Sequence, residues 1–244
     1  MFLREALYRL FHRRAAWLWL LLEPIAHIAF LMFIFTVLGM RVIGGVQAGV
    51  WIMVGLLGFF MFKRTMTLAM AGVGMAKPLF AYRQVKPVDA VLVRAATEGL
   101  LMLAISVVLL LAASLLGLSV WPDDWLGVLA AFLGLWLLGL GLGLMLSVPR
   151  ELVHEVGEIV YMAMTPLYLF SGVMFPLATV PQPYRDWLAL NPIAHGVEAM
   201  RLGFVSHYAT FPGLDFIYPY IFALVTILLG LALHHIYQKK LVQQ

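Results

Sequence analysis

The sequence contains no cysteine, so disulfide bonds, thiolate metal ligands and cysteine nucleophiles are all excluded. Charged residues are also scarce: only 11% of the 244 residues are charged, whereas 64% are hydrophobic. A soluble domain usually has about 25% charged residues. So much apolar surface could not be hidden inside a water-soluble fold. We therefore expect an all-α integral membrane protein that is surrounded by lipid.

Nucleotide-binding and hydrolytic motifs are absent as well. The nearest approach to a phosphate loop, residues 72–78, has the wrong spacing and a proline where the hydroxyl residue belongs. No HExxH, GxSxG or DxDxDG motif occurs, and no histidine pair has convincing metal-ligand spacing. We expect no enzyme activity, no cofactor and no metal in this chain. If ATP drives its function, ATP and Mg²⁺ must bind to a separate ATPase chain.

Apolar stretches are what the sequence has in abundance. A membrane-spanning helix needs about 20 mostly apolar residues. Six stretches qualify, and together they predict a single transmembrane domain over residues 1–244. We see no inverted repeat between the two halves, which weakens the case for a secondary transporter. The expected spans are residues 15–38, 48–72, 93–118, 125–148, 159–175 and 216–237.

Two further segments are apolar without being plain spans. Residues 2–14 place leucine and phenylalanine at helical spacing among arginines, which predicts an amphipathic helix lying in the membrane interface. Residues 176–215, between the fifth and sixth spans, contain five prolines but stay rich in aromatic and aliphatic side chains. Proline excludes one continuous helix there. We expect short re-entrant helices that dip into the outer leaflet.

The distribution of lysine and arginine predicts the orientation. With the N-terminus inside, eleven of these residues lie in cytoplasmic segments and three, Arg41, Arg185 and Arg201, lie outside. The positive-inside rule therefore places both termini in the cytoplasm. Because the basic residues flank apolar segments, the net charge of +4 is better explained by membrane orientation than by nucleic-acid binding.

Charges at membrane depth are the first candidates for a functional site. Glu23, Lys63 and Arg64 each lie inside an expected span, where a charge facing lipid costs about 2.5–3.5 kcal/mol. They either form internal ion pairs or snorkel, or they line a path for an anionic substrate. We favour the path, with Arg64 as its main cation and His27, one turn after Glu23, beside it. Neighbouring residues on a helix diverge, so we expect one cation to face the path and the other to pair, with Glu23 as a candidate partner.

The segment 77–89 is a candidate docking surface. Phe80 and Tyr82 supply apolar side chains, and Arg83 and Lys86 supply positive charge. This mixture favours a short helix that fits a groove in a cytoplasmic partner, although an ordinary basic surface helix would look similar. We group two residues of the fourth-to-fifth connection, Arg150 and Glu151, with the same surface.

Five stretches carry a resemblance to a known family. The chain resembles the membrane permease subunit of ABC-2 type exporters, and most of all the permease of Gram-negative capsular polysaccharide exporters. The likeness extends over nearly the whole chain. The matching stretches are LEPIAH (22–27), LFAYRQVKPVD (79–89), RAATE (94–98), PLYLFSGVMFP (166–176) and NPIAHGVEAMR (191–201).

The resemblance implies an architecture and a set of partners. Permeases of this kind are homodimers of six-helix subunits in the inner membrane, with two separate ATPase subunits docked beneath them. A lipid-linked, usually acidic polysaccharide passes through the dimer. A periplasmic adaptor and an outer-membrane channel complete the export route, and no nucleic acid is involved.

Two alternatives stay open. The same architecture exports O-antigen or teichoic acid, and the identity of the ATPase would distinguish these cases. A different class, an intramembrane lipid-modifying enzyme, would need an acid/base set near one interface. Only two groupings come close to such a set: His154 with Glu151 and Glu155, and Glu198 with His195 and Arg201.

Overall fold

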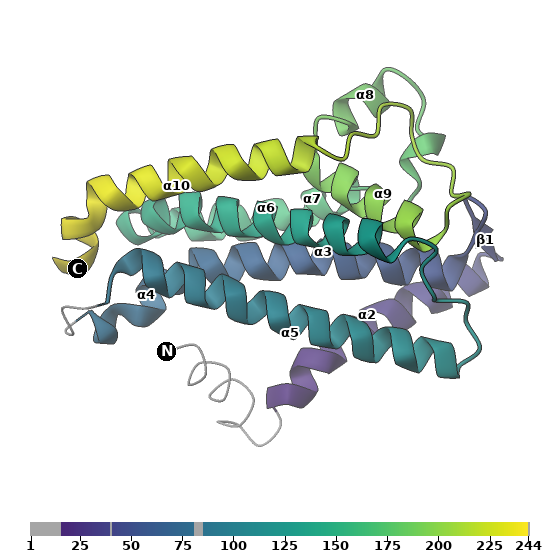
Figure 1. The fold of residues 1–244 in the computed structure, drawn as a ribbon, viewed down its shortest axis with the longest axis horizontal. Helices are drawn as coiled ribbons and strands as arrows, with labels where there is room; N and C mark the ends of the chain where they lie inside the picture. Colours follow the sequence, from purple (N-terminus) through teal and green to yellow (C-terminus); the bar gives the residue numbers. More distant parts are fainter. Residues whose placement is uncertain (1–15, 40, 81–84, 244) are drawn as a thin grey trace.

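The computed structural model describes residues 16–39, 41–80 and 85–243 (Figure 1). These residues are mostly helical, with one antiparallel pair of short strands in which Val42 lies opposite Gln47. The elements in chain order are α2 (Ala16–Val37), β1 (Val42–Ile43), β2 (Val46–Gln47), α3 (Ala48–Met70), α4 (Gly72–Ala76), η1 (Lys77–Leu79), α5 (Pro87–Leu115), α6 (Trp125–Leu152), α7 (Glu155–Phe170), η2 (Leu177–Thr179), α8 (Tyr184–Leu188), α9 (Pro192–Phe204) and α10 (Tyr218–Gln243).

Four helices in the described part of the chain are long and apolar enough to cross a membrane: α3, α5, α6 and α10. They run lengthwise beside one another, with α6 packed between α3 and α10 and with α5 against α3 (Figure 1). The most apolar window of α3 is 78% buried, whereas that of α10 is only 22% buried. Thus α3 forms the centre of the bundle, and α10 turns most of its apolar surface outward.

Glycines allow α6 to approach its neighbours closely. A Cβ atom at Gly139 would lie 2.8 Å from the carbonyl oxygen of Phe62, and one at Gly143 would lie 2.5 Å from the Cβ of Ala69. Both positions face α3, so their spacing of four residues creates one flat contact surface. The small-residue spacing in this segment therefore does serve close helix packing.

The helices overlap the apolar stretches expected from the sequence, with two differences in their bounds. Helix α7 covers Glu155–Phe170 rather than residues 159–175. Helix α5 begins at Pro87 rather than at residue 93. Proline is well tolerated in a first helical turn, and the carboxylate of Asp89 accepts the backbone N–H of Lys86 at 3.0 Å. Lys86 and Asp89 thus belong to the start of α5 instead of a separate docking helix. The segment 176–215 contains the short helices η2, α8 and α9, as its prolines predicted. The expected interfacial helix 2–14 lies outside the described residues.

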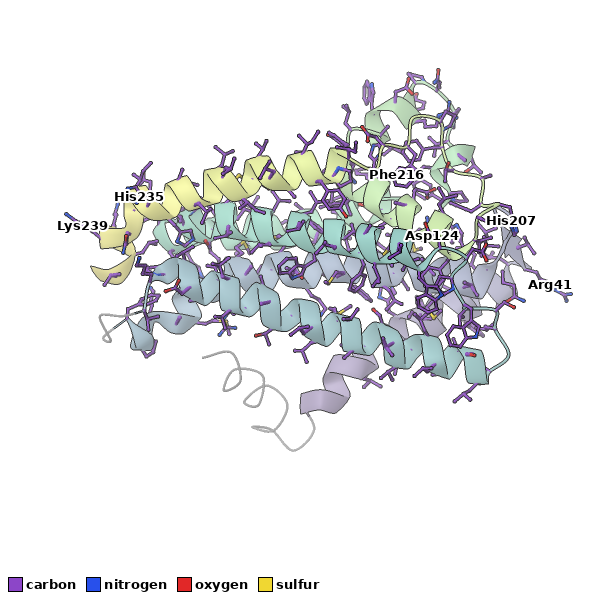
Figure 2. All side chains as sticks on the ribbon, in the orientation of Figure 1. Arg41, Asp124, His207, Phe216, His235 and Lys239 are labelled. Carbon is purple, nitrogen blue, oxygen red and sulfur yellow. The ribbon has the colours of Figure 1, made fainter. Side chains whose placement is uncertain are left out.

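The two ends of the bundle are polar. Figure 2 shows His235 and Lys239 at the end that carries the C-terminus, and Arg41 and His207 at the opposite end. We call these the C-terminal end and the hairpin end, since β1 and β2 lie at the latter (Figure 1). An apolar body between polar ends is what a protein exposed to lipid in its middle and to water at both ends requires.

The close packing of α6 on α3 can be tested with Gly143→Leu. Its new side chain would collide with Ala69 and with the carbonyl of Met66, at 2.5 and 3.1 Å from the added Cβ. We expect a loss of about 1–3 kcal/mol or more, seen as a lower apparent melting temperature in detergent. Ala130→Leu places the same leucine side chain at an exposed position of α6 and should have little effect. Equal melting temperatures for the two variants would contradict this packing.

Candidate functional site

Three aromatic side chains and one lysine, from three different helices, lie in contact with one another. The imidazole Nε2 of His27 on α2 lies 3.2 Å from the hydroxyl of Tyr168 on α7. The His27 ring also makes edge contacts with Phe60 and Tyr168, at centroid distances of 5.6 and 5.7 Å. Phe60 and Lys63 lie three residues apart on α3, so they share a face, and the Lys63 ammonium is 6.0 Å from the Phe60 ring. We call His27, Phe60, Lys63 and Tyr168 the cation–aromatic cluster.

The neighbouring cation, Arg64, points toward a different helix. Its Nε lies 2.5 Å from Oε1 of Glu98 on α5, and the Glu98 side chain is 0% exposed while that of Arg64 is 13% exposed. The side chains of successive residues point about 100° apart around a helix axis, which explains why Lys63 and Arg64 lie on different faces of α3. The pair couples α3 to α5 and keeps a carboxylate in the apolar bundle from being buried without a counter-charge.

The partner of Arg64 was not foreseen from the sequence. The expectation that one of the two cations forms an ion pair agrees with the structure, but the pair formed with Glu98 was missed. A signal was available, because Glu98 is an acidic residue inside a long apolar helix. Glu23 lies in α2, and its side chain is outside what the structure describes. The assignment of Lys63, Arg64, Glu23 and His27 to a substrate path stays a prediction.

The expected docking residues are spread over differing environments at the C-terminal end. Phe80 is only 8% exposed and packs with Val73, Ala76 and Val91. It therefore secures the connection between α4 and α5, which corrects the expectation that it offers exposed contact area to a partner. Lys86 is exposed beside the first turn of α5. Tyr82 and Arg83 lie outside the described residues.

Arg150 and Glu151 end α6 at the same end of the bundle. The carboxylate of Glu151 forms an ion pair with the Lys77 ammonium at 3.1 Å, which joins α6 to η1. The guanidinium of Arg150 lies 5.9 Å from the ring of Tyr161 on α7, and its Nη1 is buried without a hydrogen-bond partner among the described residues. These contacts connect the α4–α5 segment, α6 and α7 into one surface, as a docking site would need.

A second ion pair is buried near the hairpin end. Arg201 of α9 donates from Nη1 to Oε1 of Glu198 at 2.8 Å and to the carbonyl of Gly172 at 2.8 Å. Its Nη2 donates to the carbonyl of Val173 at 3.2 Å, and its guanidinium carbon is 3.6 Å from the centre of the Trp51 ring. The sequence analysis counted Arg201 among the cations of the outer segments, and the structure shows that its side chain is buried, with 1% exposed. It holds α9 to α3 and to the chain after α7.

Tyr208 completes this network from the loop after α9. Its hydroxyl donates to Glu198 at 3.2 Å and accepts the indole N–H of Trp51 at 3.2 Å. Burial raises the pKa of Tyr208 to about 12, so its proton is retained at neutral pH. Nearby, the backbone N–H of Ser206 donates to the carboxylate of Asp123 at 2.8 Å and lowers the pKa of that group. The hairpin end is thus held by directed hydrogen bonds.

The groupings considered for an intramembrane enzyme do not assemble a reactive centre. His195 donates from Nε2 to the carbonyl of Ala189 at 2.7 Å, and its Nδ1 accepts the N–H of Asp215 at 3.0 Å, so both ring nitrogens are occupied. Glu198 is engaged by Arg201. His154 and Glu155 lie exposed at the start of α7. Over the described ranges, no three His, Asp or Glu side chains are grouped so as to hold a metal ion.

The sequence is similar to a known family of membrane transporters. A family model described as ABC-2 type transporter matches residues 1–205. Two polysialic acid transport proteins KpsM of Escherichia coli are each 32% identical over 234 residues, which cover 96% of this chain and 90% of the relative. The capsule polysaccharide export inner-membrane protein CtrC of Neisseria meningitidis is 24% identical over 211 residues, covering 85% and 78% of the two chains.

The family match includes every residue of the cation–aromatic cluster, the Arg64–Glu98 pair and the surface formed by Lys77, Arg150 and Glu151. It agrees with the resemblance that the five sequence stretches indicated. The bundle of apolar helices with internally paired charges fits a transport subunit rather than an enzyme. The chain belongs to the ABC-2 type transporter family.

Proposed function

We propose that this chain is the permease subunit of an ATP-driven exporter that moves a lipid-linked acidic capsular polysaccharide across the bacterial inner membrane. The observation that carries the proposal is the 32% identity to polysialic acid transport proteins over 96% of the chain. Polysialic acid bears a carboxylate on every sugar. The capsule export protein of Neisseria meningitidis gives a second relative with the same class of cargo.

The proposed topology has six spans, with both termini in the cytoplasm. Besides the four long apolar helices, α2 has 22 residues and α7 has 16. At about 1.5 Å per residue, α2 reaches across a hydrocarbon core about 30 Å thick. In this topology α7 spans the membrane with the residues that follow it, and α8 and α9 are re-entrant. The interfacial helix 2–14 and the single domain 1–244 remain part of the proposal.

A homodimer would provide the wall of the transport path. Only Gly157 and Met164 are buried among the residues of α7, and on α2 both Phe30 and Phe33 are more than 60% exposed. One bundle of helices offers too little enclosed surface for a glycan. The cation–aromatic cluster lies where α2, α3 and α7 meet, next to these uncovered helices. A second copy facing them would enclose the cluster.

Within that path, we assign the electrostatic role to Lys63. Its ammonium has a cation–π contact with Phe60 and no ion pair among the described residues. A cation in a region of low dielectric attracts a carboxylate more strongly than one at a water-exposed surface. Arg64, which the sequence favoured for this role, is already held by Glu98 and is better suited to fixing the position of α3.

The C-terminal end would receive two ATPase subunits. Lys77, Arg150, Glu151 and Lys86 lie there on connected elements, with Tyr82 and Arg83 in the adjoining segment. ATP and Mg²⁺ would bind to those subunits, and this chain would bind no cofactor. A periplasmic adaptor and an outer-membrane channel would continue the route beyond the hairpin end.

If ATP binds only to the separate ATPase subunits, the purified permease alone should hydrolyse no ATP, because it has no phosphate loop. Phosphate release should equal that of a protein-free sample, and it should appear when the partner ATPase is added. Turnover by a permease shown to be free of other chains would overturn this assignment.

The two membrane-depth cations should respond differently to substitution. Lys63→Ala should abolish or greatly reduce surface polysaccharide while the permease stays at normal abundance in the membrane. Glu98→Leu alone should lower abundance, because removing one partner of a buried pair costs about 3–5 kcal/mol.

The double change Arg64→Leu with Glu98→Leu removes both charges and should restore abundance. Its export activity then decides the role of Arg64. Recovery of both abundance and export supports a structural pair. Recovery of abundance without export would show that the charges of this pair are needed for transport, and it would contradict a purely structural role for Arg64.

The docking surface can be tested with Tyr82→Ala combined with Arg83→Ala. These changes remove an aromatic contact and a steering charge from the 77–89 segment, so the ATPase should no longer copurify with a permease that is otherwise stable. Lys240→Ala removes a positive charge at the same end of the bundle and should leave copurification unchanged. Normal copurification of the Tyr82 and Arg83 variant would count against this docking site.

A further inference from the structure

A cavity toward the hairpin end has no role in the transport path described so far. Its volume of about 630 Å³ lies within the range of about 300–1,000 Å³ that is usual for small-molecule sites. Helix α8 forms one wall and projects from the side of the bundle beside the start of α10 (Figure 1). We call it the α7–α8 cavity. The side chains that matter for its chemistry are Leu167 and Phe170 of α7, Val180 after η2, Tyr184 and Trp187 of α8, and Leu190.

Hydrogen bonds hold the walls of the α7–α8 cavity in place. The carbonyl of Leu190 accepts the hydroxyl of Tyr218 on α10 at 2.8 Å. The side-chain amide of Asn191 donates to the hydroxyl of Ser171, directly after α7, at 3.0 Å. The oxygen of the same amide accepts the N–H of Ile193 at 3.0 Å. The ends of α7, α8 and α10 are therefore linked around a preformed cavity, as in most ligand sites.

The lining offers little to a polar ligand. Most of it is aliphatic or aromatic, and the Asn191 amide is already engaged. A sugar would lose hydrogen bonds to water here without replacing them. The other polar groups belong to Tyr184 and Trp187, which are 62% and 72% exposed and combine an apolar ring with a polar tip. The α7–α8 cavity therefore suits a hydrocarbon chain better than a glycan.

The α7–α8 cavity lies next to the cation–aromatic cluster. Leu167 lines the cavity, and the next residue, Tyr168, belongs to the cluster through its contact with His27. Successive side chains point about 100° apart, so α7 borders the cluster on one face and the cavity on the adjacent face. An acidic glycan that carries a hydrocarbon anchor can contact both. Once its glycan is bound, the attached chain reaches the cavity at a raised effective concentration, an advantage that bulk phospholipid does not have.

We propose that the α7–α8 cavity binds a hydrocarbon chain of the lipid anchor of the exported polysaccharide. The assignment rests on the proposed function, which supplies a lipid-linked cargo, and on the proposed orientation, which places the cavity toward the outer leaflet. The chain is held by close packing, because the hydrophobic effect does not distinguish a cavity from surrounding lipid. Bound there, the anchor keeps its glycan beside the face of α7 that carries Tyr168.

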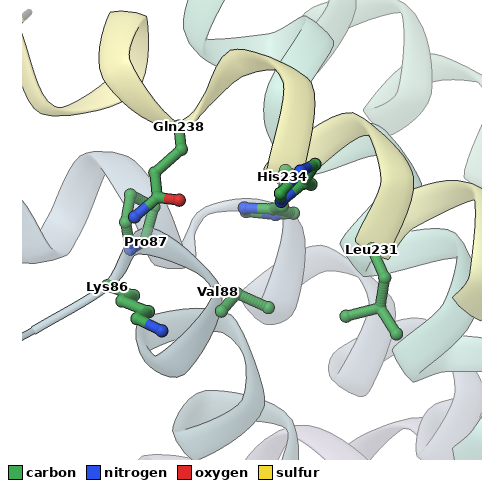
Figure 3. A pocket seen from close by; sticks show the side chains of 7 residues that line it. Lys86, Pro87, Val88, Leu231, His234 and Gln238 are labelled. Atoms are coloured by element: carbon green, nitrogen blue, oxygen red, sulfur yellow. The ribbon is translucent and has the colours of Figure 1, made fainter.

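A second cavity, at the C-terminal end, provides a matched comparison. It lies between the first turn of α5 and the last turns of α10 and has a volume of about 190 Å³ (Figure 3). Lys86 and Gln238 lie on one side of it and Leu231 on the other, so its walls alternate between polar and apolar groups. We expect no chain binding there.

Photolabelling of the purified permease in detergent measures chain binding without ATP or the ATPase. The probe is palmitic acid with a diazirine on its chain, and labelled peptides are located by mass spectrometry. We expect saturable labelling within residues 167–191. Val180→Trp fills the α7–α8 cavity and Leu190→Asn makes its wall polar, so each should lower this labelling by about fivefold or more.

Two control variants make the same changes elsewhere. Val88→Trp introduces the same indole into the cavity of Figure 3. Leu126→Asn introduces the same amide at a leucine of α6 that is 80% exposed and does not line the α7–α8 cavity. Labelling of residues 167–191 should stay within about twofold of the wild type in both.

Competitors identify the source of the chain. The lipid-linked polysaccharide, extracted from exporting cells, should suppress the labelling at concentrations about tenfold lower than phosphatidylglycerol does, because its glycan provides a second attachment. The same polysaccharide should not compete at that concentration after its lipid has been removed by hydrolysis.

Four results would overturn the proposal. Competition by the polysaccharide without its lipid would identify a sugar site, and equal competition by phosphatidylglycerol would identify an ordinary phospholipid site. Absence of saturable labelling in residues 167–191 would show that the cavity is closed to a chain, as it is if a second copy covers it. Undiminished labelling in both cavity variants would place the chain elsewhere. Each result leaves the permease assignment standing, whereas a permease that binds the anchor but exports nothing would contradict the proposed function alone.

Discussion

Pairing of buried charges is the constraint on which this structure depends. A lone charge inside an apolar bundle is costly, so each one must find a counter-charge, a carbonyl or water. Arg64 meets Glu98 between α3 and α5, whereas Arg201 and Glu198 both lie on α9 and contact α3 through the Trp51 ring. Both arrangements involve the central helix α3 and so fix its rotation. That rotation leaves Lys63 on the face shared with α2 and α7.

Close helix packing complements this electrostatic arrangement. The glycines of α6 bring its backbone against α3, while a Cβ atom at Gly230 of α10 would lie only 2.8 Å from the backbone nitrogen of Met145 on α6. Hydrophobic burial alone cannot hold helices together where lipid is the solvent, because lipid tails are equally apolar. Ion pairs and close contacts at small residues therefore add the stabilisation that hydrophobic burial alone does not supply here. In the proposed homodimer, a second copy would cover α2 and α7, which have few such contacts.

The sequence predicted the helical segments, the short helices between α7 and α10 and the family, because these follow from hydrophobicity along the chain and from local motifs. It could not predict which faces meet. Glu98 was overlooked as a partner of Arg64, Phe80 was expected to offer exposed contact area, and α5 was expected to start six residues late. The first two errors concern contacts between distant segments, and a pattern read in one dimension does not contain that information. The start of α5 depends instead on the local contact between Lys86 and Asp89.

The most direct test of the central claim is to ask whether the moving glycan passes beside Lys63. Because the native chain has no cysteine, a photo-crosslinker can be placed specifically with Thr67→Cys, one turn after Lys63 on α3, and, as a control on the exposed face of α10, with Leu228→Cys. Both variants keep Lys63. In membranes that are actively exporting, illumination should attach polysaccharide to the permease labelled at position 67 and not to the one labelled at position 228. Equal labelling at both positions, or no glycan adduct at position 67 in a variant that still exports, would contradict a path along the α2, α3 and α7 face.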